Sequence, residues 1–239
     1  MTEEVAKLGE RKFATTSERI VYRRQEDLFP LESVRDTAIT VIGAGSLGSW
    51  AVLGLTKLGM ANVTVYDNDK AEEHNMPNQL FGKASIGMPK AQALDYIISD
   101  LSPEDLSMWH NEEFLRQKLS TVVVSLVDSM DTRQAILKRC IDNEGVKFFV
   151  DARMGGTQYK VYCLDPNDPV QVARYWKNWH PDSESAPQMC TARGIVYNAV
   201  SCAMDVVNVI ATAIQGKRYP WEIFYNSTGF HKEVNWQEV

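Results

Sequence analysis

Apolar and polar positions alternate along the chain in blocks that predict strands followed by helices. Strands are predicted in short, mostly apolar runs, several of them rich in β-branched residues: 38–42, 63–66, 106–110, 120–127 and 147–150. Helices are predicted where apolar residues recur at helical spacing: 49–58, 90–101 and 130–140. Strands that alternate with helices form parallel sheets, so the pattern predicts an α/β, Rossmann-like fold with flanking helices.

The pattern changes beyond residue 154 and predicts an antiparallel C-terminal extension of the sheet. The run 157–164 alternates as an antiparallel strand does, and 221–225 is predicted as the last strand. Between them, a proline-rich stretch with a short helix over 170–176 precedes a long apolar helix over 193–215. At the other end of the chain, two helices are expected over 16–28 and 31–35.

These elements predict one domain over residues 17–239, preceded by a flexible segment, 1–16. Within the domain we expect a Rossmann-like core over 38–153 and a C-terminal part over 154–239, with a crossover loop over 165–190.

Composition narrows the classes of partner. The chain has 239 residues, 44% of them hydrophobic, and a formal net charge of −6. Tight binding to nucleic acid or anionic membranes needs clustered Lys and Arg, so an acidic chain makes both unlikely partners. The N-terminus has no apolar signal core, and no run reaches the ~18 apolar residues that span a bilayer. The four cysteines include no C-x-x-C pair, so we expect no structural zinc and a reduced, cytoplasmic protein.

A glycine-rich turn follows the first predicted strand. Gly43, Gly45 and Gly48 stand at the first, third and sixth positions of the turn that leads into a helix. This spacing is typical of a turn whose backbone N–H groups face a phosphate at the helix N-terminus. The alternative is a tight strand–helix turn whose glycines serve packing only.

Polar residues follow three further predicted strands, at Asp67, Asp128 and Asp151. Ligands of parallel sheets bind beyond the carboxyl ends of the strands, so these residues indicate a site at that edge. Asp67 lies 24 residues after Gly43, near the ~20-residue offset at which an acid binds ribose hydroxyls. A ribose is common to NAD and ATP, so this feature does not separate them, and a solvated turn aspartate is the other interpretation.

The stretch from 67 to 91 is more specific, and it resembles the ThiF/MoeB superfamily, which includes the ubiquitin-activating and sulfur-carrier-activating enzymes. The matching motifs are Asp67-x-Asp69, Asn75-x-x-Asn78-Gln79, Gly87-x-x-Lys90-Ala91, Asp128 followed by Arg133, and Arg24-Gln25. The resemblance covers roughly residues 17–230. It implies ATP-dependent adenylation of a carboxylate with Mg²⁺, the carboxylate belonging to a small ubiquitin-fold protein that ends in Gly-Gly. It also implies a homodimer.

The resemblance assigns roles to the matching residues. The three glycines would hold phosphate, Asp67 would bind ribose with Asp69 beside it, and Lys90 would bind the phosphates. Asp128 would hold Mg²⁺, Asp131 is a second, weaker candidate, and Asn75 and Gln79 would line the nucleotide site. Arg24 would reach the partner's ATP across the dimer interface. The alternatives are a helix-capping role for Asp128 and Asp131 and a solvated first-turn position for Lys90.

One position departs from the family pattern. Asn78 stands where the family has an arginine, so a cation that contacts phosphate is replaced by a neutral amide. Arg153 is our candidate substitute, with a salt bridge to Asp151 or Asp128 as its alternative. Arg133 matches a family arginine whose role is structural in the simplest interpretation.

Cys190 is the candidate second nucleophile, because many relatives transfer the acyl group to a cysteine. It precedes the long helix expected to begin near Arg193, and a thiol at a helix N-terminus has a lowered pKa. The alternative is a small buried residue, the interpretation we adopt for the other cysteines: Cys140, Cys163 and Cys202.

Three hypotheses follow from the sequence. The first is an adenylyltransferase for the C-terminus of a ubiquitin-like or sulfur-carrier protein. The second is a catalytically weak or inactive subunit of the same fold that pairs with a partner, for which Asn78 is the reason. The third is an NAD(P)-dependent Rossmann oxidoreductase, which explains Gly43 to Gly48 and Asp67 but not Lys90, Asp128 and Arg24 together.

Overall fold

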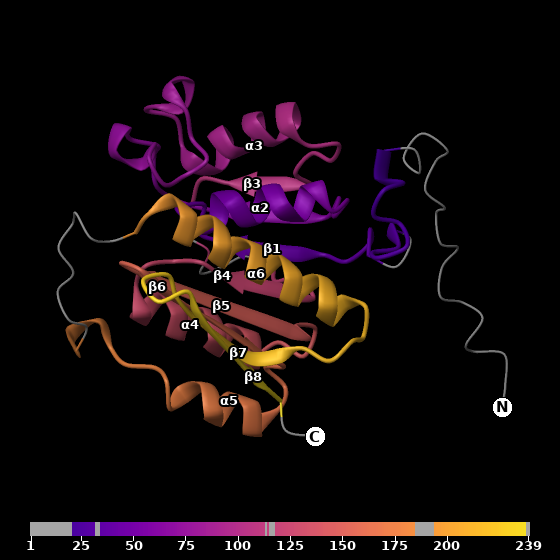
Figure 1. Cartoon of the computed structure of the whole chain (residues 1–239), viewed down its shortest axis with the longest axis vertical. Helices are drawn as coiled ribbons and strands as arrows, with labels where there is room; N and C mark the ends of the chain where they lie inside the picture. The colour runs from indigo at the N-terminus through magenta and orange to yellow at the C-terminus, as the bar shows by residue number, and fades with distance from the viewer. Residues whose placement is uncertain (1–20, 32–33, 113, 115–117, 185–193, 238–239) are drawn as a thin grey trace, which may run out of the picture.

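A computed structural model describes residues 21–31, 34–112, 114, 118–184 and 194–237 of the chain. One mixed sheet runs through the molecule in the order β3-β2-β1-β4-β5-β6-β7-β8 (Figure 1). Its parallel strands are β1 (Ile39–Ile42), β2 (Val63–Tyr66), β3 (Met108–His110), β4 (Val122–Ser125) and β5 (Phe148–Gly155). Its antiparallel strands, after β5, are β6 (Gln158–Leu164), β7 (Pro220–Asn226) and β8 (His231–Trp236).

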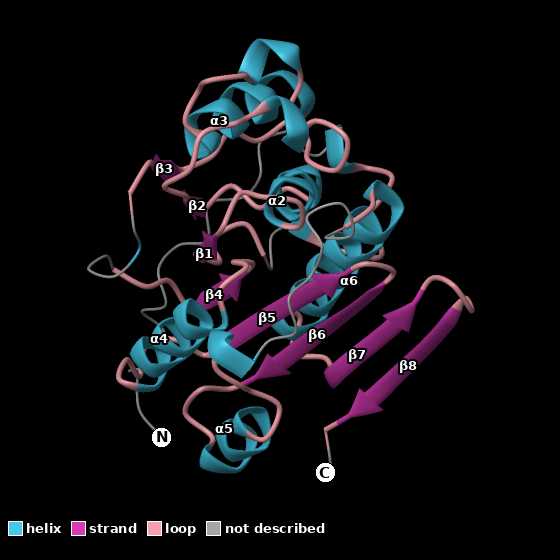
Figure 2. Ribbon diagram, turned by 90° about the vertical axis from the view of Figure 1, so that its left-hand side faces the viewer, coloured by secondary structure: helices cyan, strands magenta, loops and turns pink. Residues whose placement is uncertain are grey.

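Helices cover both faces of this sheet (Figures 1 and 2). On one face lie α2 (Gly48–Lys57), α3 (Lys90–Leu101) and α6 (Val196–Ile214). On the other lie α4 (Met130–Ile141) and α5 (Pro169–Trp176). Short 3-10 turns at Glu73–Asn75, Lys83–Ser85 and Asp182–Glu184 complete the described elements. The predicted α/β fold, mostly parallel with an antiparallel C-terminal extension, is therefore confirmed.

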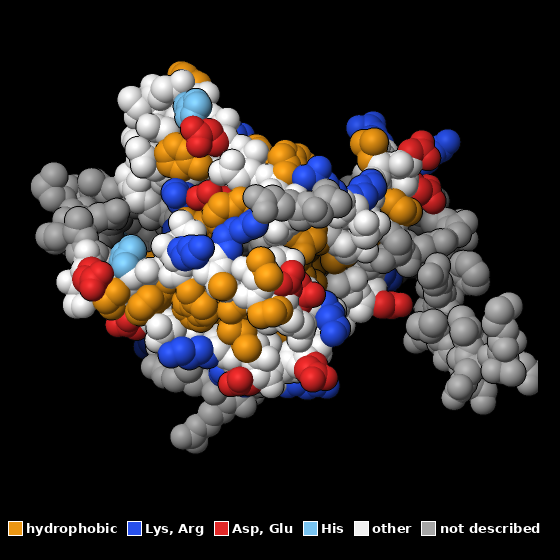
Figure 3. All heavy atoms as spheres, turned by 90° about the horizontal axis from the view of Figure 1, so that it is seen from below, with side chains coloured by type: hydrophobic (Ala, Val, Ile, Leu, Met, Phe, Trp, Pro, Cys, Tyr) orange, Lys and Arg blue, Asp and Glu red, His pale blue; other side chains and the backbone are white. Residues whose placement is uncertain are grey.

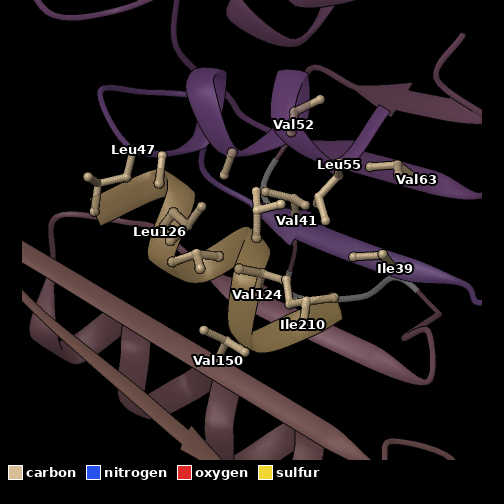
Figure 4. Close-up of a cluster of buried hydrophobic side chains, with 14 of the residues drawn as sticks. Ile39, Val41, Leu47, Val52, Leu55, Val63, Val124, Leu126, Val150 and Ile210 are labelled. Atoms are coloured by element: carbon tan, nitrogen blue, oxygen red, sulfur yellow. The ribbon is translucent and has the colours of Figure 1, made fainter. Parts of the chain in front are cut away.

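The central strands are apolar on both faces because both faces are covered. Every residue of β1 and β4 is buried. Figure 4 shows how Val41, Val124 and Val150 from neighbouring strands converge with Leu55 of α2 and Ile210 of α6. Burying each such side chain stabilises the fold by about 1.5–3 kcal/mol. This core fixes the carboxyl ends of β1, β2 and β4 side by side, with Ile42 opposite both Tyr66 and Ser125.

Several predicted boundaries were wrong. Residues 23–28 form turns in place of a helix, and α6 begins at Val196 in place of Arg193. Strand β8 was missed because His231–Trp236 is exposed and mostly polar, so its sequence lacks the apolar alternation of a half-buried strand. Residues 1–16 lie outside the described part of the chain.

The largest correction concerns Asp151, which was predicted to follow the end of a strand. It lies within β5, which continues to Gly155 and pairs with β6. The Asp151 side chain is 0% exposed, and Arg133, Arg153 and the Tyr175 hydroxyl all donate hydrogen bonds to it. Because these donors satisfy the carboxylate, a polar residue is tolerated inside the sheet.

α6 is the one described helix that is long and apolar enough to cross a membrane by length and composition. Half of that stretch is buried, and its apolar residues Cys202, Val206 and Ile210 lie in the core against the sheet.

Seen from the α5 end of the molecule (Figure 3), a band of hydrophobic side chains is bordered by both basic and acidic ones. Among the described residues on that face, basic and acidic side chains alternate around the band.

The Asp151 ion pairs generate a stability prediction. Asp151→Asn leaves two guanidinium groups in the interior without their counter-charge, so we expect a loss of about 3–5 kcal/mol in the free energy of unfolding by urea. Glu233→Gln is the control, because the Glu233–His231 pair is more than half exposed and is expected to contribute less than about 1 kcal/mol. Equal losses in the two variants would contradict the prediction.

The same residue predicts a pH dependence. Burial raises the pKa of Asp151, but Arg133 and Arg153 outweigh it and hold that pKa below its usual value. A carboxyl group whose pKa is lower in the folded than in the unfolded state stabilises the fold fully at pH values above its unfolded pKa of about 4. That stabilisation is lost as the pH falls from there through the folded-state pKa. The free energy of unfolding should therefore fall more steeply in the wild type than in Asp151→Asn between pH 5 and pH 2. Parallel curves would refute this.

Candidate functional site

The glycine turn between β1 and α2 has one position that is open and two that are closed. Gly43 has a φ of +98°, and a Cβ there would lie 2.6 Å from the Leu126 carbonyl oxygen. A Cβ on Gly48 would lie 1.8 Å from the Gly43 carbonyl oxygen, so strand and helix meet closely there. A Cβ on Gly45 would meet nothing within 4 Å. Packing therefore explains Gly43 and Gly48, whereas Gly45 leaves space above the turn for a ligand.

Asp67 lies next to this turn at the end of β2. Its carboxylate accepts hydrogen bonds from the backbone N–H groups of Ala44 (2.6 Å) and Asp69 (2.8 Å). Burial raises the pKa of Asp67 above its usual value. The two N–H donors and the nearby charge of Lys90 lower that pKa but do not outweigh burial. A carboxylate fixed against the glycine turn is placed to accept further hydrogen bonds from ligand hydroxyls.

Lys90 begins α3 and its side chain is 9% exposed. Its ammonium group donates to the Asp69 carboxylate at 2.8 Å, and its backbone N–H donates to the Asp69 carbonyl. The partner Asp69 is 66% exposed. This ion pair brings Lys90 and Asp69 together beside Asp67. Because the Asp69 carboxylate is exposed, the contact is weak and the Lys90 ammonium group can leave it for a ligand.

Asn75 ends the 3-10 turn Glu73–Asn75, in the segment between β2 and α3, and Asn78 and Gln79 follow it directly. Asn75 is buried, and its side-chain oxygen accepts from the Glu72 N–H at 2.9 Å, which accounts for its burial structurally. The Gln79 side-chain oxygen is buried and has no hydrogen-bond partner within the described residues. An unpartnered buried acceptor is costly, so a donor from a ligand would stabilise Gln79.

Asn78 is joined to the turn and to the start of α6. The Trp50 indole of α2 donates to the Asn78 carbonyl at 3.1 Å. A Cβ built on Gly194 would lie 3.7 Å from the Asn78 amide nitrogen and 2.5 Å from the Met154 methyl group. The Asn78 amide nitrogen therefore lies close to Gly194.

Asp128 lies between β4 and α4. It is exposed, and its carboxylate has no hydrogen bond or ion pair with any described residue. Helix α4 is capped instead by Ser129, whose hydroxyl accepts from the Thr132 N–H at 3.1 Å. Asp131 is also exposed and is the second residue of α4, in its first turn. The capping interpretation of Asp128 is thus not what the structure has, and its carboxylate is available.

Asp182 was not predicted and reaches the same place from the segment that follows α5. Its carboxylate accepts from the Ser129 hydroxyl and the Met130 N–H, both at 2.7 Å, and these donors hold the pKa of Asp182 below its usual value. The contact joins residues 53 positions apart. No local sequence signal identifies such a pair.

Arg153 and Arg133 have structural partners. Arg153 donates to Asp151 and to the Asn178 carbonyl, and its guanidinium stacks on the rings of Tyr162 and Tyr175. Arg133 is buried and donates to Asp151 and to the Val127 carbonyl. The proposed role of Arg153 as the substitute phosphate cation therefore has no geometric support, and its salt-bridge alternative is what the structure has.

Arg24 lies at the other end of α2 from the glycine turn. Its neighbour Gln25 donates to the Leu58 carbonyl at 2.8 Å, directly after that ten-residue helix. Ten helical residues extend about 15 Å, so an arginine side chain does not reach back to Gly45 of its own chain. Arg24 itself is exposed.

Cys190 lies outside the described residues. Its predicted role as a second nucleophile therefore stays a prediction, and the described part of α6 begins at Val196. The other three cysteines are buried and free, as predicted. Burial raises the pKa of Cys140 to about 12, so its thiol is unreactive.

No group of three or more His, Cys, Asp or Glu that could hold a metal occurs among the described residues. Among those residues, this finding excludes a metal site built from three or more such protein ligands. Mg²⁺ in nucleotide sites uses one or two carboxylates together with phosphates and water, and the available, exposed Asp128 fits that type of site.

Comparisons with known proteins identify the family of the chain and proteins that share its fold. A sequence profile of the ThiF family matches residues 19–219. Over 127 residues the chain is 28% identical to ubiquitin-like modifier-activating enzyme 5 of Rattus norvegicus, a match that covers 46% of this chain and 32% of that protein. It is 27% identical over 122 residues to tRNA threonylcarbamoyladenosine dehydratase of Bacillus subtilis, which covers 48% of each. The matched region is therefore less than half of each of these relatives.

Solved structures share the fold. The crystal structure of PaaA has a TM-score of 0.73 at 14% identity, covering 96% of this chain and 76% of that one. The structure of E. coli MccB with ATP has a TM-score of 0.70 at 12% identity, covering 93% and 72%. MccB was also solved with AMPCPP and MccA.

The open position in the turn gives a binding prediction. Gly45→Ala adds a methyl group that meets no protein atom, so the melting temperature should stay within about 2 °C of wild type. ATP affinity, measured by calorimetry, should fall at least about tenfold, or ~1.4 kcal/mol, because the methyl occupies the ligand's space. Unchanged affinity in Gly45→Ala would leave that glycine without a ligand role. Gly48→Ala is the contrast, because it clashes with backbone and should lower the melting temperature.

Proposed function

The chain belongs to the ThiF family, and we propose that it adenylates a carboxylate with ATP, the substrate being the C-terminal glycine of a small ubiquitin-like or sulfur-carrier protein. The observation that carries the proposal is the convergence of three features at one sheet edge: an open position at Gly45, a fixed carboxylate at Asp67 and an available carboxylate at Asp128. Parallel strands β1, β2 and β4 bring them together.

The residues divide the work of binding and holding ATP. The N–H groups of the glycine turn, at the start of α2, would face phosphate, and Asp67 would accept hydrogen bonds from ribose hydroxyls. Lys90 would leave Asp69 for the phosphates. Asp128 would hold Mg²⁺, with Asp131 as the second candidate; the ion would offset negative charge on the phosphates.

The reaction follows from holding two anions together. A carboxylate oxygen of the substrate bonds to the α-phosphorus as the bond from that phosphorus to the α–β bridging oxygen breaks, which yields an acyl-adenylate and pyrophosphate. No proton has to move in this step. The protein's contribution is therefore orientation of the carboxylate and stabilisation of charge by Lys90 and by the groups held at Asp128.

The substrate class is supported by the relatives. One relative is named for activation of a ubiquitin-like modifier. Of the two MccB structures, one holds ATP and the other holds AMPCPP together with MccA. The dehydratase relative is named for a tRNA nucleoside, but the net charge of −6 disfavours tRNA here. Transfer of the acyl group to Cys190 would be a later step.

Arg24 supports a homodimer. It is exposed and lies a helix length from its own glycine turn, so it would act on the ATP of a second copy.

Asn78, in contrast, favours a second candidate function: a weakly active or inactive subunit that pairs with an active partner. The nicotinamide alternative retains only the glycine turn and Asp67 in its favour.

ATP–pyrophosphate exchange tests the proposal. With small ubiquitin-fold proteins ending in Gly-Gly as candidate substrates, wild-type protein should exchange label, and Asp128→Ala should reduce the rate at least about 100-fold. ATP binding without exchange across such a panel would favour the inactive subunit. NADH binding without ATP binding would establish the oxidoreductase alternative.

Mixed dimers test the role of Arg24. Arg24→Ala and Asp128→Ala homodimers should both be inactive, because each lacks one half of every site. A mixture of the two variants should recover exchange, since a heterodimer contains one intact site, up to about a quarter of the wild-type rate for random mixing. No recovery, with heterodimers demonstrated by tag pull-down, would contradict action across the interface.

A further inference from the structure

The connection between β4 and α4 that carries Asp128 is held from both sides. On the upstream side, the Val127 carbonyl accepts from Arg133, which is 4% exposed and also donates to the Ala152 carbonyl at 2.9 Å. Arg133 is itself fixed by the buried Asp151. The residue before Asp128 is therefore tied to β5.

On the downstream side, the segment after α5 holds the first turn of α4. Asp182 accepts from the Ser129 hydroxyl and the Met130 N–H, and more weakly from the Asp131 N–H at 3.4 Å. The Trp179 indole donates to the Met130 carbonyl at 2.8 Å. Both residues that follow Asp128 are therefore fixed by side chains from a distant segment.

A helix N-terminus has unsatisfied N–H groups that attract a nearby carboxylate. Asp128 is two residues before the helix and would be a ready source of one, yet its carboxylate is exposed and has no partner within the described residues. Asp182 and Ser129 occupy the donors instead. The distant carboxylate thus takes the place that Asp128 would otherwise fill.

We propose that Asp182 is a positioning residue: it satisfies the N-terminus of α4 so that the Asp128 carboxylate stays directed to the cation that accompanies ATP. The inference rests on the proposed function of Asp128. Without Asp182, Asp128 turns toward the free N–H groups of α4 and its affinity for a divalent cation falls. Residues that support a metal ligand change affinity by about 10–100-fold when removed.

A matched pair of variants separates this role from loss of a helix cap. Asp168 caps α5 as Asp182 caps α4, accepting from the Val170 and Gln171 N–H groups. Asp182→Ala and Asp168→Ala each remove one capping carboxylate, and each should cost about 0.5–2 kcal/mol of stability. Only Asp182→Ala should weaken the cation site. Asp182→Asn keeps an acceptor oxygen and should restore part of the affinity.

The measurement is binding of Mn²⁺ to the protein–ATP complex, followed by electron paramagnetic resonance of free Mn²⁺. Asp182→Ala should raise the dissociation constant about tenfold, with Asp168→Ala within twofold of wild type. In an Asp128→Ala background, Asp182→Ala should have no further effect, because its influence passes through Asp128. Equal shifts in the two capping variants, or a full Asp182 effect without Asp128, would overturn the proposal.

Exchange assays distinguish failure of this inference from failure of the proposed function. If the proposed function holds, Asp182→Ala should need about tenfold more Mg²⁺ for half-maximal ATP–pyrophosphate exchange and should approach wild-type rates at saturating Mg²⁺. If the wild-type protein shows no ATP–pyrophosphate exchange with any of the tested carboxylate substrates, the proposed function fails. The Mn²⁺ measurement still decides the role of Asp182 in that case. Absence of the Mg²⁺ shift in an active variant would refute the positioning role alone.

Discussion

A fully buried carboxylate, Asp151, is the interaction on which the C-terminal half of the structure depends. It is bound by two arginines and a tyrosine that come from α4, β5 and α5. Removing a carboxylate from water is costly unless such partners replace its hydration. The Arg133 that pairs with Asp151 also donates a hydrogen bond to the Val127 carbonyl. The arginine that makes a buried carboxylate tolerable within β5 therefore also fixes the connection that carries Asp128.

The parallel half of the fold could be predicted because its signals are local. β-branched runs mark β1, β2 and β4, and Gly43 to Gly48 mark the turn into α2. What could not be predicted depends on contacts distant in the sequence. Asp151 resembles a strand end until its arginine partners are known, and β8 pairs with β7 through an exposed backbone with little apolar pattern. Asp182 had no local signal because its partners lie in another segment.

The site residues divide in the same way. Gly45, Asp67, Asp69 and Lys90 were predicted from motifs, and the structure brings them to one edge of the sheet. Arg153 was proposed for phosphate on proximity in sequence to a presumed strand end, and it is instead committed to Asp151 and stacked on two tyrosines. The charge needed around a triphosphate therefore has to come from Lys90, from a cation held at Asp128 and, in our account, from Arg24 of a second copy.

The most direct test of this account is to look for the adenylated product itself. A ubiquitin-fold protein ending in Gly-Gly is incubated with the chain and ATP labelled at the α-phosphate, and the intact partner is analysed by mass spectrometry. We predict that label and the mass of one adenylyl group appear on the partner's C-terminus, with pyrophosphate released. Release of phosphate from the γ position, with no adenylyl group on any carboxylate, would contradict the account.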